Sequence, residues 1–290
     1  KITLTPFSFL GVWGYSMFTY FLVVGIFFLK RNYRVSIFFL IPFFALFFVN
    51  EKFLLSEKKK IDKINIRLVQ PNIPQIEKWD KNKIEKNLKF LVQLTLEDNY
   101  ENVDLVIWPE TSVPFDIQNN SENFLELKSK LKKINNLIIG GINKEIEPEV
   151  KIYNSLFLLK ENLKDTYIHN KLKLVPFGEF IPLRNFLRKK YITISGIDFS
   201  RGEKVNIFPL SKNIKILPLI CYEVIFPSIT RHKSNEYNLI INITNDAWYG
   251  KSKGPAQHFA LAKIRAVQEG KYLLRVANTG ISGIIDYNGN

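Results

Sequence analysis

Cys221 is the only thiol of the 290-residue chain, and it directly follows the apolar run Ile214–Ile220, which predicts a buried β-strand. A strand that ends in a sharp turn exposes the side chain at the turn. A helix that starts just after it would aim backbone N–H groups at the sulfur and favour a nucleophilic thiolate. Taken alone, Cys221 also fits an inert cysteine packed in the core.

A cysteine nucleophile needs a general base, which is usually a histidine. None of the three histidines lies in a motif that would pair it with the thiol; they are His169, His232 and His258. Glu110 is the alternative, because the segment Ile107–Thr111 lies where a predicted buried strand ends. Beside the apolar Trp108 and Pro109 we expect its pKa to be raised, which suits a base near neutral pH. Taken alone, Glu110 also fits an acid without a catalytic role, either in a surface loop or at a helix N-terminus.

Lys171 lies in a segment that places cations before an apolar turn with Pro and Gly, and Glu179 closes that segment. The segment reads HNKLKLVPFGE over residues 169–179. A lysine held near the thiol would favour the thiolate and stabilise a developing oxyanion. Lys171 is one of many lysines, so its setting alone carries this prediction.

The elements that must position these side chains begin near residue 60, where short β-rich runs start to alternate with helical stretches. The predicted strands are Ile64–Val69, Leu105–Trp108, Leu137–Gly140, Ser155–Leu159, Ile214–Cys221, Leu239–Thr244, Tyr272–Ala277 and Ile281–Asp286. The predicted helices are Lys81–Leu96, Asn123–Leu131 and Pro255–Glu269. Strands mixed with helices over ~230 residues indicate an α/β sandwich.

Two apolar runs precede this region, and 12 of the 24 phenylalanines fall within the first 50 residues. Phe7–Leu29 has 23 residues without a charge, and about 20 such residues span a bilayer core. Val35–Val49 has 15 residues and contains Pro42, so a re-entrant or buried helix is its alternative. A signal peptide is the alternative for the first run. Two apolar runs joined by a short polar turn predict a transmembrane helical hairpin.

The turn between the two runs contains Lys30, Arg31 and Arg34. The positive-inside rule places this turn in the cytoplasm, and everything after Asn50 is then extracytoplasmic. A second group of lysines within residues 51–63 weakens that assignment. We therefore predict transmembrane helices over residues 1–50, a linker over 51–63 and a catalytic domain over 64–290.

The composition excludes several classes of site. One cysteine forms no internal disulfide and no multi-cysteine zinc or iron–sulfur site, and we expect neither a metal nor an organic cofactor. The chain has 41 Lys and Arg against 27 Asp and Glu, a formal charge of +14, but its basic residues do not cluster with aromatics as in nucleic-acid binding. The positive charge indicates either compositional drift or a surface that faces anionic lipid headgroups. Each Lys or Arg held near such headgroups contributes about 1 kcal/mol to binding.

The candidate segments, in their order along the chain, resemble the nitrilase (carbon–nitrogen hydrolase) superfamily and, within it, the apolipoprotein N-acyltransferase family. The resemblance covers most of residues 5–286. Its matching stretches are VQPNIPQ (69–75) with Lys78-Trp79, WPET (108–111), KLKLVPFGEFIP (171–182), CYE (221–223) and NITNDAWYGKSKGPAQH (242–258), continuing into Ala266 and Asn278-Thr279-Gly280. This resemblance implies an α/β fold, a nitrilase-like αββα sandwich preceded by a transmembrane helical hairpin. It also implies Glu110 as general base, Lys171 as oxyanion stabiliser and Cys221 as nucleophile.

The resemblance implies four further roles. Glu179 orients Lys171. The two residues after the nucleophile, Tyr222 and Glu223, support it. Trp79 lies on a loop near the entrance and contacts lipid. Apolipoprotein N-acyltransferases have a larger membrane bundle, so the chain departs from their pattern: it shows two spans and ends at Asn290, before an expected final span. A fragment lacking further spans is therefore one reading of the sequence.

The implied reaction moves an acyl chain from a phospholipid through a thioester on Cys221 to the α-amine of a diacylated apolipoprotein. The implied location is the bacterial inner membrane, multi-pass, with the catalytic domain on the periplasmic side and no nucleic-acid partner. A membrane-anchored amidase or hydrolase with the same triad, and an inactive binding remnant, remain as alternatives. The acyl-chain preference and the oligomeric state stay open.

Overall fold

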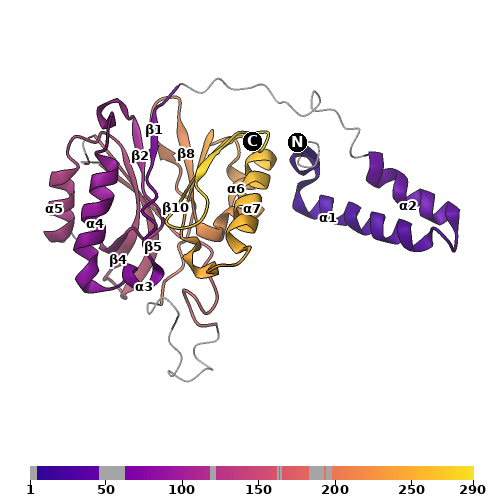
Figure 1. Ribbon diagram of the computed structural model, residues 1–290, viewed down its shortest axis with the longest axis horizontal. Coiled ribbons are helices and arrows are strands. Elements are labelled where there is room, and N and C mark those ends of the chain that lie inside the picture. The colour runs from indigo at the N-terminus through magenta and orange to yellow at the C-terminus, as the bar shows by residue number, and fades with distance from the viewer. Residues whose placement is uncertain are drawn as a thin grey trace.

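The computed structural model describes residues 5–45, 63–117, 122–161, 163, 165–182, 193 and 198–290. An N-terminal helical hairpin extends to one side of an α/β part that contains all the strands described (Figure 1). The predicted linker over residues 51–63 lies outside the described residues except for Lys63.

Helices α1 (Thr5–Phe28) and α2 (Tyr33–Ala45) form the hairpin. Small residues bring the two helices close together. Ser36 Oγ donates to the carbonyl oxygen of Gly25 at 2.7 Å, and a Cβ on Gly25 would lie 2.5 Å from Leu40 Cγ. Such small-residue contacts are typical of helices that pack against each other in lipid.

Within the hairpin, Leu10–Phe28 is the one described stretch that is long and apolar enough to cross a membrane. This stretch has 19 residues, but the backbone leaves helical geometry at Gly11 (φ 66°, ψ −178°). The continuous helix after Gly11 rises about 25 Å, somewhat less than the thickness of a hydrocarbon core. Trp13 is 81% exposed and Phe38 on α2 is 70% exposed, an outward apolar surface that water does not favour. Helix α2 has 13 described residues, and the end of the predicted second run, residues 46–49, lies outside the described residues.

The first sheet has the strand order β1-β2-β4-β5-β6, and β3 pairs with β4. Its strands are β1 (Ile66–Leu68), β2 (Leu105–Ile107), β3 (Val113–Asp116), β4 (Leu137–Glu145), β5 (Lys151–Lys160) and β6 (Asp165–Asn170). Strands β1, β2 and β4 are parallel, whereas β4, β5 and β6 pair antiparallel. Strands β2 and β6 therefore run in the same direction, and both end at the same edge of the sheet.

The second sheet has the strand order β11-β10-β9-β8-β7. Its strands are β7 (Phe208–Pro209), β8 (Lys215–Ile220), β9 (Leu239–Thr244), β10 (Tyr272–Ala277) and β11 (Gly283–Ile285). The three central strands are parallel and the two edge strands are antiparallel to them. The central strands are apolar along almost their whole length, as expected for a parallel sheet covered on both faces.

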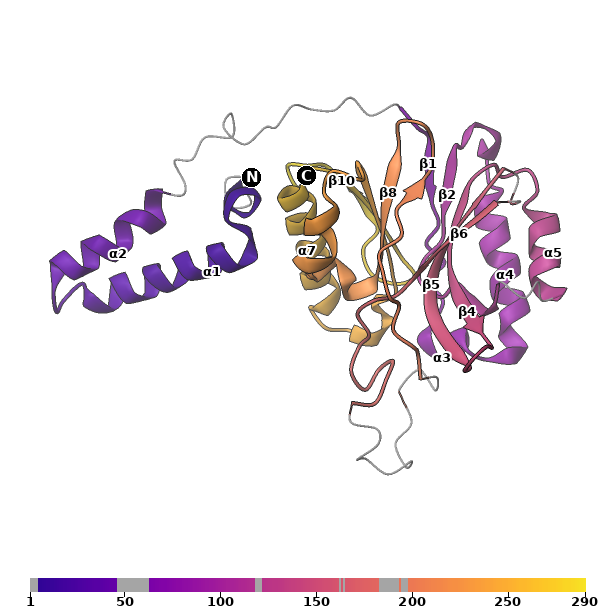
Figure 2. The ribbon, with the colours of Figure 1, turned by 180° about the vertical axis from the view of Figure 1, so that it is seen from behind.

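The two sheets pack face to face between two layers of helices (Figure 2). Helices α4 (Lys81–Thr95) and α5 (Glu122–Lys130) cover the first sheet, and α6 (Pro227–Thr230) and α7 (Gly254–Glu269) cover the second. Alternation along β2 explains how one strand serves two layers. Leu105 and Ile107 enter the core between the sheets, whereas Val106 faces the helices.

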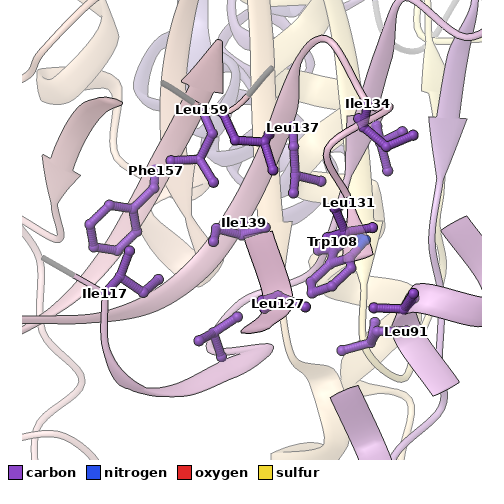
Figure 3. Packing of buried hydrophobic residues seen from close by; sticks show 14 of the residues in the cluster. Leu91, Trp108, Ile117, Leu127, Leu131, Ile134, Leu137, Ile139, Phe157 and Leu159 are labelled. Atoms are coloured by element: carbon purple, nitrogen blue, oxygen red, sulfur yellow. The ribbon is translucent and has the colours of Figure 1, made fainter. Parts of the chain in front are cut away.

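Three apolar clusters hold these layers together, one under each helix layer and one between the sheets. In the cluster under α4 and α5, the buried Trp108 lies among Leu91, Leu131 and Leu137 (Figure 3). Its Nε1 donates to Thr95 Oγ1 at 2.8 Å, so the polar atom of this large side chain is also satisfied. The predicted αββα sandwich is confirmed.

Candidate active site

Cys221 lies directly after β8 and begins the short 3₁₀ helix η4 (Cys221–Ile225). Its φ is 54°, a left-handed conformation that is uncommon for a residue with a side chain. The Nδ2 of Asn242 on β9 donates to the Cys221 carbonyl oxygen at 3.0 Å. The predicted sharp turn is therefore present, but the helix after it is a 3₁₀ helix that starts at the cysteine itself.

Glu110 lies just beyond the end of β2 and is buried. Gly140 on β4 makes room for its turn, because a Cβ there would lie 2.5 Å from the backbone nitrogen of Thr111. Thr111 has a φ of 43°, so the turn is tight. The Oε2 of Glu110 is buried and has no hydrogen-bond partner among the described residues, which leaves one carboxylate oxygen available to accept a proton.

Lys171 follows the last residue of β6 and is 1% exposed. Its Nζ lies 3.1 Å from Glu110 Oε1 and 2.9 Å from Glu179 Oε1. The Nδ2 of Asn154 on β5 donates to the same two oxygens, each at 2.8 Å. Glu110 and Lys171 meet because β2 and β6 end at the same sheet edge. Glu179 is therefore in direct contact with Lys171.

Glu223 joins the Cys221 turn to the lysine segment. Its Oε2 accepts the backbone N–H of Ile220 at 2.8 Å, and its Oε1 accepts those of Leu172 at 2.6 Å and Lys173 at 3.2 Å. The Nε2 of His169 lies 3.6 Å from Glu223 Oε2. One buried carboxylate thus fixes the residue before Cys221 and the residue after Lys171.

Tyr222 adds a second connection between the same two segments. Its hydroxyl donates to the carbonyl oxygen of Leu174 at 2.6 Å, and the Nζ of Lys171 lies 5.7 Å from the centre of its ring. This ring is close enough for a cation–π contact with the ammonium. Both residues after Cys221 therefore help to place Lys171.

The charges of the site interact across this cluster. Burial alone would raise the pKa of Glu110, but Lys171, Lys78 and the Asn154 hydrogen bond bring that pKa below its ordinary value. Burial alone would lower the pKa of Lys171, but Glu110 and Glu179 raise it well above its ordinary value. The prediction of a raised pKa for Glu110 is thus wrong, because it considered the apolar neighbours and not the cations.

Cys221 is a protonated thiol in this arrangement. Burial and the charge of Glu110 raise its pKa to about 12, although Lys171 acts in the opposite direction. Lys171 therefore favours the thiolate, as expected, but burial and the charge of Glu110 outweigh it. Glu110 and Lys171 both act electrostatically on the sulfur, and a protonated thiol needs a base to lose its proton.

A second buried polar cluster is hydrogen-bonded to the Cys221 turn through Asn242. Arg275 on β10 donates to Asp246 Oδ2 at 2.9 Å and to Asn242 Oδ1 at 2.5 Å. His258 Nδ1 lies 2.8 Å from Asp246 Oδ1. Since Asn242 also donates to the Cys221 carbonyl oxygen, this cluster holds the backbone of the turn in place. The described residues contain no group of three or more His, Cys, Asp and Glu side chains that could hold a metal ion.

The profile of the carbon-nitrogen hydrolase family matches residues 65–290. The chain belongs to the carbon-nitrogen hydrolase family. Two solved structures share the fold: a CN-hydrolase superfamily protein of Xanthomonas campestris, 18% identical with a TM-score of 0.57, and a nitrilase superfamily member of Saccharomyces cerevisiae, 21% identical with a TM-score of 0.55. Each alignment covers 79% of this chain and 85% or 86% of the other.

Curated relatives of this carbon-nitrogen hydrolase include proteins named apolipoprotein N-acyltransferase. The one from Rickettsia prowazekii is 43% identical over 227 residues, and the one from Allorhizobium ampelinum is 38% identical over 240 residues. The alignments cover 77% and 78% of this chain and 45% of each relative. The chain therefore spans less than half the length of these relatives, and the predicted resemblance to them is confirmed.

Two buried polar residues of this candidate site received no role from the sequence: Asn154 was missed, and Lys78 was named only within a matching stretch. Asn154 is a polar residue on the buried strand β5, and this interruption of an apolar run was an available signal. Lys78 is 5% exposed, and its Nζ donates to the Glu110 carbonyl oxygen at 2.8 Å. The adjacent Trp79 is half-buried, and its Nε1 is buried without a hydrogen-bond partner among the described residues.

Proposed function

We propose that this chain is the catalytic part of an apolipoprotein N-acyltransferase that carries an acyl chain on Cys221. The supporting observation is the contact of Glu110 and Lys171 beside the Cys221 turn, in a chain 43% identical to a relative of that name. The acyl donor is a phospholipid, and the acceptor is the α-amine of a diacylglyceryl-cysteine at a lipoprotein N-terminus. Residues 64–290 form the catalytic domain, 51–63 a linker and 1–50 the membrane helices.

In the first half-reaction, Glu110 Oε2 takes the proton from the Cys221 thiol as the sulfur attacks the ester carbonyl carbon. The resulting oxyanion is stabilised by the Lys171 ammonium and by backbone N–H groups of the turn. The carbon–oxygen ester bond then breaks. The departing alkoxide of the lysophospholipid takes the proton back from Glu110, and a thioester remains on Cys221.

In the second half-reaction, the acceptor α-amine attacks the thioester carbonyl and gives a proton to Glu110. The carbon–sulfur bond breaks, an amide is formed, and the thiolate of Cys221 regains the proton from Glu110. Water must stay out while the thioester waits, because water would hydrolyse it. Substrates anchored in lipid suit this requirement, and Trp79 is the residue that we assign to contact them.

The membrane arrangement belongs to the same proposal. The turn with Lys30, Arg31 and Arg34 lies in the cytoplasm, both helices of the hairpin cross the inner membrane, and the catalytic domain lies on its periplasmic side. This side is where a lipid-anchored acceptor and the outer-leaflet phospholipids both lie within reach of one site. Glu179, Tyr222 and Glu223 position Lys171 and Cys221 in this scheme.

The experiment that tests the proposal incubates the full chain in detergent with phospholipid and a diacylated lipopeptide. Mass spectrometry of the protein is expected to show an acyl adduct on Cys221, and that of the lipopeptide an added N-acyl group. Release of ammonia from small amides without acyl transfer would instead support an amidase. A protein with neither activity and no thiol-probe labelling at Cys221 would be a binding remnant.

A further inference from the structure

Lys78 is a buried lysine that the proposed reaction leaves without a role. It ends the four-residue helix α3 (Gln75–Lys78) and is 5% exposed. Among the described residues its ammonium forms no direct ion pair with a carboxylate; it donates a hydrogen bond to the Glu110 carbonyl oxygen at 2.8 Å. Lysines are almost never fully buried without a partner, so this placement calls for a specific reason.

That reason lies in the turn that presents Glu110. The side chain of Lys78 reaches the backbone of the turn, whose next residue, Thr111, has a φ of 43°. Lys78 and Glu110 also line the same narrow cavity of about 10 Å³, together with Asn87 and Asn278. A cavity of this size has room for about one water molecule, so little solvent reaches the surfaces of Lys78 and Glu110 that line it.

The charges of Lys78 and Glu110 act on each other. Burial lowers the pKa of Lys78 to about 8, while Glu110 and Cys221 oppose this and Lys171 adds to it. In return, the charge of Lys78 is one of the causes that hold the pKa of Glu110 below its ordinary value. The lysine therefore favours the ionised carboxylate, which is the form that can accept a proton.

We propose that Lys78 is a positioning residue for the base: it fixes the Glu110 turn through the backbone carbonyl and keeps the Glu110 carboxylate ionised through its charge. This inference rests on the role that the proposed function gives to Glu110. Because Lys78 directly precedes Trp79, the same short segment joins the base to the residue assigned to contact lipid.

The test follows the pH dependence of the reaction of Cys221 with 2,2′-dipyridyl disulfide, a thiol probe that stays reactive in acid and needs no lipid. The full chain in detergent is used. The groups that act on Lys78 are Glu110, Cys221 and Lys171. The acid limb is the part of the profile in which the reaction slows as the pH falls and a base becomes protonated. Glu110→Gln removes the base, so the acid limb that this variant lacks is the one due to Glu110. In Lys78→Met we expect that limb to move upward by about one pH unit, because a neighbouring opposite charge is lost. In Lys78→Arg the charge is kept and the limb stays near its native position.

Lys83→Met is the matched control, because Lys83 is a half-buried lysine of α4 whose ammonium pairs with Glu77 at 2.8 Å; its profile should equal that of the wild type. An acid limb in folded Lys78→Met that coincides with the wild-type limb would overturn the proposal. If Lys78→Met does not fold, Lys78→Arg decides, and an upward movement despite the retained charge overturns the proposal. A limb that survives Glu110→Gln contradicts the role of Glu110 and this inference together. A Lys78-dependent limb without acyl transfer would leave this inference standing and count against the proposed substrates alone.

Discussion

The Oε1 of Glu223 accepts the backbone N–H of Leu172 at 2.6 Å, across a separation of 51 positions in the chain. Its Oε2 holds Ile220 at 2.8 Å. The carboxylate is fully buried, so these N–H groups replace the water that a charged group requires. The distance between the lysine segment and the cysteine turn is therefore set by one side chain of fixed length.

Replacing Glu223 by Gln is expected to weaken this connection, because an amide group turns an N–H donor toward other donors. Leaving buried backbone N–H groups unpaired costs about 1–3 kcal/mol. We expect a lower midpoint in urea unfolding together with a slower reaction of Cys221 with a thiol probe. The exposed Glu236→Gln is the control; equal stability and reactivity of wild type and Glu223→Gln would contradict this role.

Cys221→Ala is expected to abolish formation of the acyl-enzyme, since no other thiol is present in the chain. Cys221→Ser replaces the thiol by a hydroxyl, and the oxygen ester that this hydroxyl forms turns over far more slowly. Mass spectrometry of each variant after exposure to phospholipid measures the adduct. Turnover near that of the wild type in either variant would refute Cys221 as the nucleophile.

Gly140→Ala tests how the Glu110 turn is held. The new Cβ would lie 2.5 Å from Thr111 N and 2.6 Å from the Pro109 carbonyl oxygen, both of them backbone atoms that cannot rotate away. We expect a loss of about 1–3 kcal/mol in the free energy of unfolding, as for other overpacked sites, and a slower reaction of Cys221.

Gly283→Ala is the matched control for this substitution, because a Cβ there would meet only Phe259 Cζ, at 4.0 Å. Its stability should remain close to that of the wild type. A Gly140→Ala protein with native stability and native thiol reactivity would show that β4 does not confine the Glu110 turn.

The dependence of stability on pH follows from the two shifts around Lys171. Glu110 has a lowered pKa, so its contribution is present above the ordinary value of 4.5 and is lost as the pH falls further. Lys171 has a raised pKa, so its contribution is present below the ordinary value of 10.5 and is lost as the pH rises above it. Urea midpoints measured across this range should show a plateau between the two limits.

Glu110→Gln is expected to reduce the acid-side loss of stability, because the titrating carboxylate is gone. The exposed Glu101→Gln should keep the acid-side slope of the wild type. A Glu110→Gln protein with an unchanged acid-side slope would indicate that other carboxylates account for the loss.

The parts of the fold that sequence patterns predicted are those with strong periodicity or continuous apolar runs. Lys81–Leu96 was predicted as a helix and forms α4 over Lys81–Thr95, and the apolar run before Cys221 forms β8. Strand β6 was missed because its sequence, DTYIHN, is mostly polar and is recognised as a strand only through its pairing with β5. Yet β6 is the element that delivers Lys171.

The site could be predicted in its residues but not in its electrostatics. The order of Glu110, Lys171 and Cys221 along the chain pointed to one constellation, and the structure brings Glu110 and Lys171 into contact. The pKa of Glu110 depends on Lys78 and Asn154, which lie 32 and 44 positions away in the chain. A local reading of the apolar neighbours could not include these distant partners.

The amide nitrogen of Asn154 donates hydrogen bonds to both Glu110 Oε1 and Glu179 Oε1, and the Lys171 ammonium donates to the same two oxygens. Both lone-pair directions of Glu110 Oε1 are thereby taken, and only Oε2 is left for incoming hydrogen. Every proton that Glu110 accepts or returns must then pass through Oε2, one proton at a time. Under the proposed chemistry, Glu110 must return the thiol proton to the first leaving group before it can accept a proton from the second substrate.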